Sequence, residues 1–176
     1  MTFGTRPTLL LVDDEPDLLL SLQGLLRQEF QLFVAESGPS ALKIVEAETI
    51  HVVMSDQRMP QMSGDELLAR IAQLSPATVR ILLTGYADIQ DVIRALNTGG
   101  LFRYLTKPWD LDELTEVLHQ AVAHYRQTIE RYDSRQRTQR FTREVLAFLR
   151  SLPESSTAQE LIRQALELSN TETLPR

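Results

Sequence analysis

The sequence contains no cysteine, which excludes disulfide bonds and thiolate metal sites. It also has no long hydrophobic run, and its longest apolar stretches, such as residues 9–12 and 18–20, are far too short to span a bilayer. Residues 1–7 lack the charged and apolar blocks of a secretory signal peptide. The absence of cysteine suits a reducing compartment. We therefore expect a cytoplasmic protein with no membrane partner.

Charge is distributed unevenly along the 176 residues. Residues 1–126 contain 17 acidic and 10 basic residues, a net charge of −7, whereas residues 127–176 contain 7 acidic and 8 basic residues, a net charge of +1. An acidic first part argues against a nucleic-acid surface there. The difference indicates two parts with different roles.

Short apolar stretches alternate along the chain with segments whose apolar residues recur at helical spacing. The expected strands are residues 8–12, residues 31–35, the run before Asp56, residues 79–83 and residues 101–105. Strands without polar alternation are typical of a parallel sheet that is covered by helices on both faces. We predict an α/β fold with a five-stranded parallel sheet in the order 2-1-3-4-5, helices on both faces and a C-terminal helical extension.

Polar residues stand where four of the predicted strands end. They are Asp13 and Asp14 after the first strand, Asp56 after the third, Thr84 after the fourth and Lys107 after the fifth. The carboxyl ends of parallel strands form one edge of the sheet, where ligand sites of open α/β folds lie. We therefore expect these five side chains to meet.

The predicted cluster has the composition of a phosphoryl-transfer site. Crowded carboxylates repel one another, and a cation can relieve the repulsion. Because all the available ligands are oxygen atoms, the hard ion Mg²⁺ is the expected metal. A metal, an ammonium group and a hydroxyl around Asp56 would position a phosphoryl group, with Asp56 as the nucleophile that forms an acyl phosphate. Taken singly, each residue has a plainer interpretation as a helix cap or a solvated side chain, and the joint arrangement favours function.

Residues 8–125 resemble the receiver domain of bacterial two-component response regulators. The matching pieces are Asp13-Asp14, Asp56 with Met59-Pro60 and Gly64, Thr84-Gly85, Lys107-Pro108 and, as the switch aromatic of the family, Tyr104. The resemblance covers about two-thirds of the chain, and the motifs stand in the right order and at the right spacing.

This resemblance implies that Asp56 accepts a phosphoryl group from a sensor histidine kinase or a phosphotransfer protein. It also implies that Mg²⁺ is held by Asp14, Asp56 and the backbone carbonyl of Arg58, with assistance from Asp13. The chain would then be a signalling switch that catalyses only its own phosphoryl transfer and dephosphorylation, and not an enzyme with a separate substrate.

Further residues would act after phosphorylation. The resemblance implies that Thr84 and Lys107 contact the phosphoryl oxygens and that the Lys107–Pro108 peptide bond is cis. Thr84 and Tyr104 would form a switch that alters the surface of the fourth helix, the fifth strand and the fifth helix. That surface would control a downstream output protein or domain.

We expect a receiver domain over residues 1–125 and a helical extension over residues 126–176. From Leu111 to about Arg150 the chain has no proline or glycine, which permits one long helix. Pro153 would end it, and a short last helix would start at the capping box of Thr157 and Glu160. The extension also contains spaced apolar residues, namely Ile129, Tyr132, Phe141, Val145, Phe148 and Leu152. These residues predict a homodimer, with a fold-back of the last helix as the alternative.

Three classes of function stay open. The leading hypothesis is a phosphorylation switch, and the second is a receiver fold used only for docking, independently of phosphorylation. The third is nucleic-acid binding through residues 131–150, which contain six arginines and two acidic residues. Nucleic acid is the least expected partner, because aromatic and groove-reading side chains are not organised in that segment.

Overall fold

The structure is a computed structural model that describes residues 6–85, 101–151, 160 and 163–164. The chain divides into two compact units, Met1–Thr128 and Ile129–Arg176. The predicted fourth helix, which would carry residues 92–96, lies outside the described residues. So do Pro153 and most of the predicted last helix.

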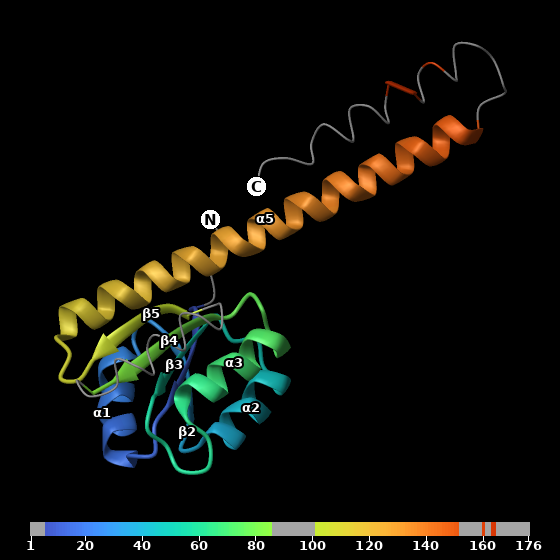
Figure 1. Cartoon of the computed structure of the whole chain (residues 1–176). Coiled ribbons are helices and arrows are strands. Elements are labelled where there is room, and N and C mark those ends of the chain that lie inside the picture. The colour runs from blue at the N-terminus through green and yellow to red at the C-terminus, as the bar shows by residue number, and fades with distance from the viewer. Residues whose placement is uncertain (1–5, 86–100, 152–159, 161–162, 165–176) are drawn as a thin grey trace. The chain divides into compact units, whose positions relative to one another are not determined.

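Strands and helices alternate from the first strand to the fourth, as predicted, and the fifth strand is followed by a helix (Figure 1). The elements are β1 (Thr8–Val12), α1 (Pro16–Leu26), β2 (Gln31–Ala35), α2 (Gly38–Ala47), β3 (Val52–Asp56), α3 (Gly64–Leu74), β4 (Val79–Thr84), β5 (Leu101–Thr106) and α5 (Leu111–Ser151). The five strands form one parallel sheet in the order β2-β1-β3-β4-β5. The predicted fold class and strand order are confirmed.

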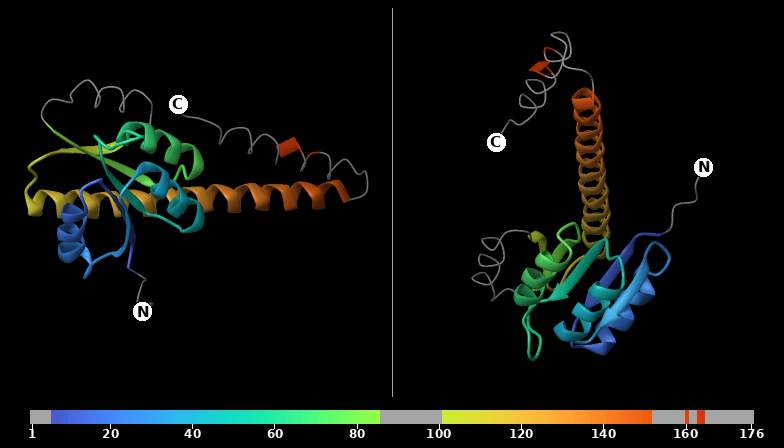
Figure 2. Two further views of the ribbon diagram at one scale, coloured as in Figure 1. Left: turned by 90° about the horizontal axis from the view of Figure 1, so that it is seen from below. Right: turned by 90° about the vertical axis from the view of Figure 1, so that its right-hand side faces the viewer.

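Helices cover both faces of this sheet, and each face has its own hydrophobic core (Figure 2). On one face, α1 and the first turns of α5 pack against Leu9, Met54, Ile81 and other strand residues. On the opposite face, α2 and α3 pack against alternate residues such as Leu10 and Leu82. Burial of both faces explains why the strands show no polar alternation in the sequence.

Local signals fix where several of these helices begin. Pro16 is the first residue of α1, a position where its missing N–H costs no helical hydrogen bond. Ser37 precedes α2, and its hydroxyl accepts a hydrogen bond from the backbone N–H of Ser40 at 3.4 Å. These helix starts fix the length of the connections that follow the carboxyl ends of β1 and β2.

Strand β5 contains one extra residue relative to β4. Arg80 pairs with Leu101, but the next residue, Ile81, pairs with Arg103, so the register shifts at this point. Beyond the shift, Leu82 pairs with Tyr104 and Thr84 pairs with Thr106. Such a β-bulge changes which residues of the strand share a face of the sheet.

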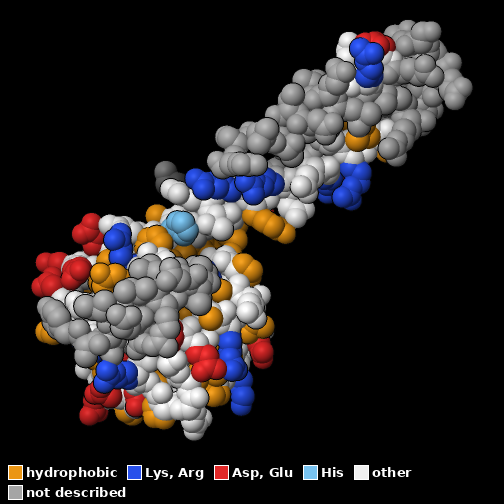
Figure 3. All heavy atoms as spheres, viewed as in Figure 1, with side chains coloured by type: hydrophobic (Ala, Val, Ile, Leu, Met, Phe, Trp, Pro, Cys, Tyr) orange, Lys and Arg blue, Asp and Glu red, His pale blue; other side chains and the backbone are white. Residues whose placement is uncertain are grey.

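Helix α5 is continuous over 41 residues, as the absence of proline and glycine predicts. One face of its first turns, formed by Leu114, Val117, Leu118, Ala121 and Val122, belongs to the core of the first unit. In the second unit, Tyr132, Phe141 and Phe148 are 61%, 67% and 64% exposed. Figure 3 shows basic side chains along this unit. No helix in the described part of the chain is both long and apolar enough to cross a membrane.

Candidate functional site

One ammonium group joins the carboxylates that follow β1 and end β3. The Lys107 Nζ lies 2.5 Å from Asp56 Oδ1 and 3.0 Å from Asp13 Oδ2. Asp13 is 1% exposed and Asp56 is 7% exposed, so both charges are held largely out of water. Carboxylates buried to this degree need a cationic partner, and Lys107 supplies one to both.

The environment of Lys107 keeps it charged. Burial lowers the pKa of its ammonium group, but hydrogen bonds and charge attraction from Asp56 and Asp13 outweigh burial, and the net pKa is raised. Its Nζ also lies 5.8 Å from the ring centroid of Trp109, a cation–π distance. The peptide bond between Lys107 and Pro108 is cis.

The second oxygen of Asp56 is held by the chain itself. Asp56 Oδ2 accepts a hydrogen bond from the backbone N–H of Arg58 at 2.6 Å. Asp13 is fixed in a similar way, because its Oδ1 accepts from the backbone N–H of Glu15 at 2.9 Å. These hydrogen bonds give the two carboxylates defined orientations.

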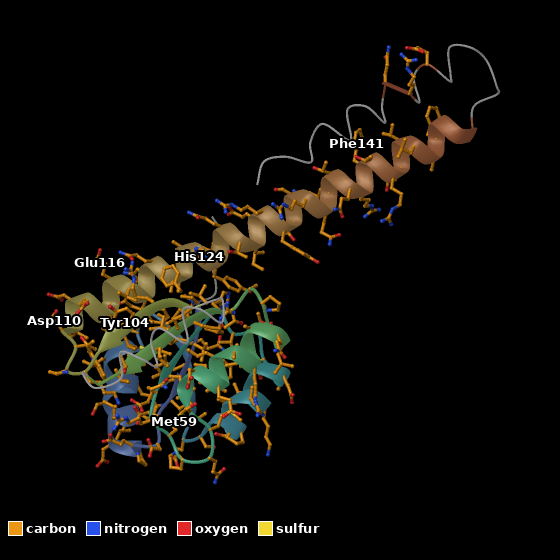
Figure 4. All side chains as sticks on the ribbon, in the orientation of Figure 1. Met59, Tyr104, Asp110, Glu116, His124 and Phe141 are labelled. Carbon is orange, nitrogen blue, oxygen red and sulfur yellow. The ribbon has the colours of Figure 1, made fainter. Side chains whose placement is uncertain are left out.

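Thr84 and Tyr104 lie on adjacent strands, but Tyr104 is two residue positions further from the carboxyl ends of the strands. Thr84 is buried at the end of β4, and its carbonyl oxygen accepts the backbone N–H of Lys107 at 2.8 Å. Tyr104 is paired two residues earlier, opposite Leu82, and its side chain is 44% exposed (Figure 4). The strand pairing places Thr84 and Tyr104 on the same face of the sheet.

The oxygen donors at this edge fit Mg²⁺ in kind. They are the carboxylates of Asp13 and Asp56, the exposed Asp14 beside them, and the backbone carbonyl of Arg58, which follows the N–H that contacts Asp56. Within the ranges that the structure describes, no three acidic or histidine side chains form a metal cluster by themselves.

Two features of the site had no predicted role. Gln57, which directly follows Asp56, is 4% exposed and makes paired hydrogen bonds with Asp65. Trp109 is half-buried against the core that contains α1 and α5. Sequence signals for both were weak, because a polar residue after a strand end and an aromatic residue before a helix are common in loops.

Comparisons with known proteins give a consistent result. Residues 9–119 match the family described as the response regulator receiver domain. The hydrogenase transcriptional regulatory protein HoxA of Bradyrhizobium diazoefficiens is 40% identical over 119 residues, which are 68% of this chain and 24% of that protein. The transcriptional regulatory protein GlrR of Escherichia coli K12 is 39% identical over 115 residues, 65% of this chain and 26% of that protein.

A solved structure extends the comparison to three dimensions. The signal receiver domain of an HD domain-containing protein from Pseudomonas fluorescens Pf-5 has a TM-score of 0.71 and is 42% identical. The match covers 74% of this chain and 97% of that one. The chain spans about a quarter of the length of the curated relatives it matches.

Proposed function

Because this chain belongs to the response regulator receiver domain family, we propose that Asp56 accepts a phosphoryl group from a sensor histidine kinase or a phosphotransfer protein. Membership places the chain in two-component signalling. The observation that carries the proposal is the geometry around Asp56, whose carboxylate is bound by Lys107 at 2.5 Å and by the Arg58 N–H at 2.6 Å. These two contacts fix the orientation of the Asp56 carboxylate, which positions it for attack.

In the proposed step, an oxygen of Asp56 attacks phosphorus and forms the P–O bond of an acyl phosphate. The bond between phosphorus and the donor nitrogen or oxygen breaks, and the leaving group takes up a proton from solvent when it requires one. Lys107 neutralises charge on the phosphoryl oxygens, and Thr84 donates its hydroxyl to one of them. We propose on this basis that the chain is a signalling switch that catalyses only its own phosphoryl transfer and dephosphorylation.

We propose that Mg²⁺ is held by Asp14, Asp56 and the backbone carbonyl of Arg58, with Asp13 assisting. When bound, the ion supplies positive charge that stabilises the transferred phosphoryl group. The protein's own contribution is to hold the carboxylates and the Arg58 peptide in a fixed arrangement, as the contacts of Asp56 and Asp13 support.

The proposed output is a change at the predicted surface of β5, α5 and the fourth helix, which lies outside the described residues. Phosphorylation adds charge and strong hydrogen-bond acceptors beside Thr84. Movement of the Thr84 side chain towards them frees space on its face of the sheet, and Tyr104 turns inward. Because the relatives are transcriptional regulators about four times as long as the matched region, the proposed output is transcriptional control through a further domain or partner.

We also propose a homodimer formed through the second unit. Phe141 and Phe148 lie seven residues apart on α5, so they share a face of that helix, and they are more than half exposed, as is Tyr132. Figure 4 shows Phe141 on this part of α5, and exposed apolar side chains commonly mark an interface. Sedimentation velocity would compare the intact chain with a version that ends at Arg126. A dimeric intact chain and a monomeric truncated chain are expected, whereas an intact chain that is monomeric at micromolar concentration would exclude the dimer.

Incubation with Mg²⁺ and acetyl phosphate, followed by intact mass measurement, tests the central proposal. The wild type should gain the mass of one phosphoryl group, and Asp56→Asn should gain none. A mass gain that survives Asp56→Asn would show that another residue is modified. If no donor, including a purified phosphotransfer protein, adds mass to the wild type, a docking adaptor that works without phosphorylation becomes the better function.

A further inference from the structure

The loop between β3 and α3 is closed by the side chain of the residue that follows the phosphoacceptor. The Gln57 amide donates from Nε2 to Asp65 Oδ1 at 3.0 Å, and its Oε1 accepts the backbone N–H of Asp65 at 3.1 Å. The Gln57 backbone is bonded as well, because its N–H donates to the Leu83 carbonyl at 2.9 Å and its carbonyl accepts the Gly64 N–H at 3.0 Å. A buried amide that is bonded at every polar group has one fixed position.

Asp65 is held equally firmly from the other side. Its Oδ1 also accepts the Ser63 hydroxyl at 2.5 Å. Burial alone raises the pKa of the Asp65 carboxyl, but hydrogen bonds from Ser63, Gln57 and nearby backbone N–H groups outweigh burial, and the net pKa is lowered. Gln57 and Asp65 therefore form a clamp, made of two reciprocal hydrogen bonds, across the ends of loop 58–63.

The clamped loop presents backbone groups to the phosphorylation site. Arg58, its first residue, donates its N–H to Asp56 Oδ2. The rest of the loop has a specific shape, because Met59 and Met62 are buried in the core and Gln61 adopts a positive φ of 71°. A left-handed residue is tolerated only where its surroundings hold it. Without the side-chain clamp, the two ends of the loop would keep the backbone hydrogen bond between Gly64 and Gln57 and lose both hydrogen bonds of the Gln57 side chain.

We propose that Gln57 and Asp65 are positioning residues that set the Arg58 peptide for phosphoryl transfer and for Mg²⁺ binding at Asp56. This inference rests on the proposed function and adds two residues to it. Neither side chain contacts Asp56, and each acts through the backbone of the loop. Residues that orient ligands in this way typically change metal affinity by about 10–100-fold when they are removed.

The clamp could instead only stabilise the fold, so the test needs a measurement that stability does not affect. Trp109 provides it, because it is the only tryptophan in the chain and lies 5.8 Å from the Lys107 Nζ that binds Asp56. A cation that binds Asp56 competes with Lys107, so tryptophan fluorescence should follow a Mg²⁺ titration. Phosphorylation rates with acetyl phosphate at saturating Mg²⁺ give a second, independent reading.

Four full-length variants separate the possibilities. Asp65→Ala and Gln57→Met each break the paired bonds and should weaken Mg²⁺ binding about 10-fold or more. Asp65→Asn keeps the Oδ1 acceptor and should remain within about three-fold of the wild type. Glu66→Ala is the matched control, because it removes only an exposed ion pair with Arg70 in the same helix and should leave Mg²⁺ affinity unchanged.

Wild-type Mg²⁺ affinity and phosphorylation rate in folded Asp65→Ala would overturn the inference. Equal losses in Asp65→Asn and Asp65→Ala would do the same, since geometry would then not be the cause. If Asp65→Ala does not fold, Gln57→Met carries the test with the same expected loss. A wild type that binds Mg²⁺ but takes up no phosphoryl group would contradict the proposed function alone.

Discussion

Two glycines in helices of the first unit should respond in opposite directions to the same substitution. Gly64 begins α3, and a Cβ placed there would overlap the backbone carbonyl oxygen of Asp56 and lie 2.8 Å from Leu82 Cδ1. Gly24 lies inside α1, and a Cβ placed there would meet no other heavy atom of the described chain within 4 Å. Both glycines belong to helices, so comparing the two Gly→Ala variants separates the effect of close packing from the effect of helix propensity.

The magnitudes follow from these distances. Alanine gains about 1 kcal/mol over glycine in a helix interior, so Gly24→Ala should raise the free energy of unfolding by about 0.5–1 kcal/mol. At Gly64 the overlap is with backbone, which cannot move aside as a flexible side chain could. Overpacking costs about 1–3 kcal/mol or more, which exceeds the propensity gain, so Gly64→Ala should lose about 2 kcal/mol.

Urea unfolding followed by circular dichroism measures both changes as shifts of the midpoint at constant slope. Intact mass after treatment with acetyl phosphate adds a functional reading, since displacement of the Asp56 carbonyl should slow phosphorylation of Gly64→Ala and leave Gly24→Ala unaffected. If Gly64→Ala is as stable as the wild type, the close approach between α3 and the end of β3 is not a constraint and the reasoning fails.

Three further predictions concern charge and switching. The pKa of the Lys107 ammonium group is raised in the folded state, so the stability that this group contributes is fully present below its unfolded pKa of 10.5 and is lost as the pH rises through its folded pKa. The difference in unfolding free energy between the wild type and Lys107→Met should therefore shrink above about pH 10.5. Burial, and to a smaller extent the charge of Arg126, lowers the pKa of His51, whose Nδ1 accepts a hydrogen bond from the Thr8 N–H. The stability that neutral His51 contributes is therefore present above its unfolded pKa of 6.5 and is lost as the pH falls through its folded pKa. Urea midpoints of the wild type should therefore fall more steeply between pH 7 and 5 than those of His51→Gln. Thr84→Ala should still be phosphorylated but should lose the response of partner binding or oligomeric state, and a normal response would rule out the proposed switch.

Elements with a strong periodic pattern could be predicted from the sequence. The apolar runs identified all five strands, and the order of the sheet followed from the rules for parallel crossovers. The uninterrupted helix after Leu111 was predicted because neither proline nor glycine breaks it, and it extends to Ser151. These features depend on local composition, which a single sequence displays directly.

The site could be predicted in part for the same reason. Asp13, Asp56 and Lys107 meet because strand ends of a parallel sheet share an edge, which is a property of the topology. The bonds between Gln57 and Asp65 could not be predicted, because residues eight apart in a loop and a helix have no characteristic spacing. Burial of a glutamine also depends on finding partners for all its polar atoms, and that is known only once the chain has folded.

The extra residue in β5 gives that strand one more side chain on a single face than a regular strand of the same span would have. Phe102 and Leu105 both pack towards the core shared by α1 and α5, although they are three positions apart, and a regular strand would place them on opposite faces. Deleting Phe102 would remove the bulge but leave the strand pairing on either side of it unchanged, so Tyr104 and Leu105 would keep their faces and only the Phe102 ring would be lost from the core. One residue inserted between Arg103 and Tyr104 would instead exchange the faces of Tyr104 and Leu105. The aromatic ring would then point into the helical core and a leucine would occupy the face that Tyr104 shares with Thr84, so this insertion should abolish the proposed Tyr104 response even though Asp56 is intact.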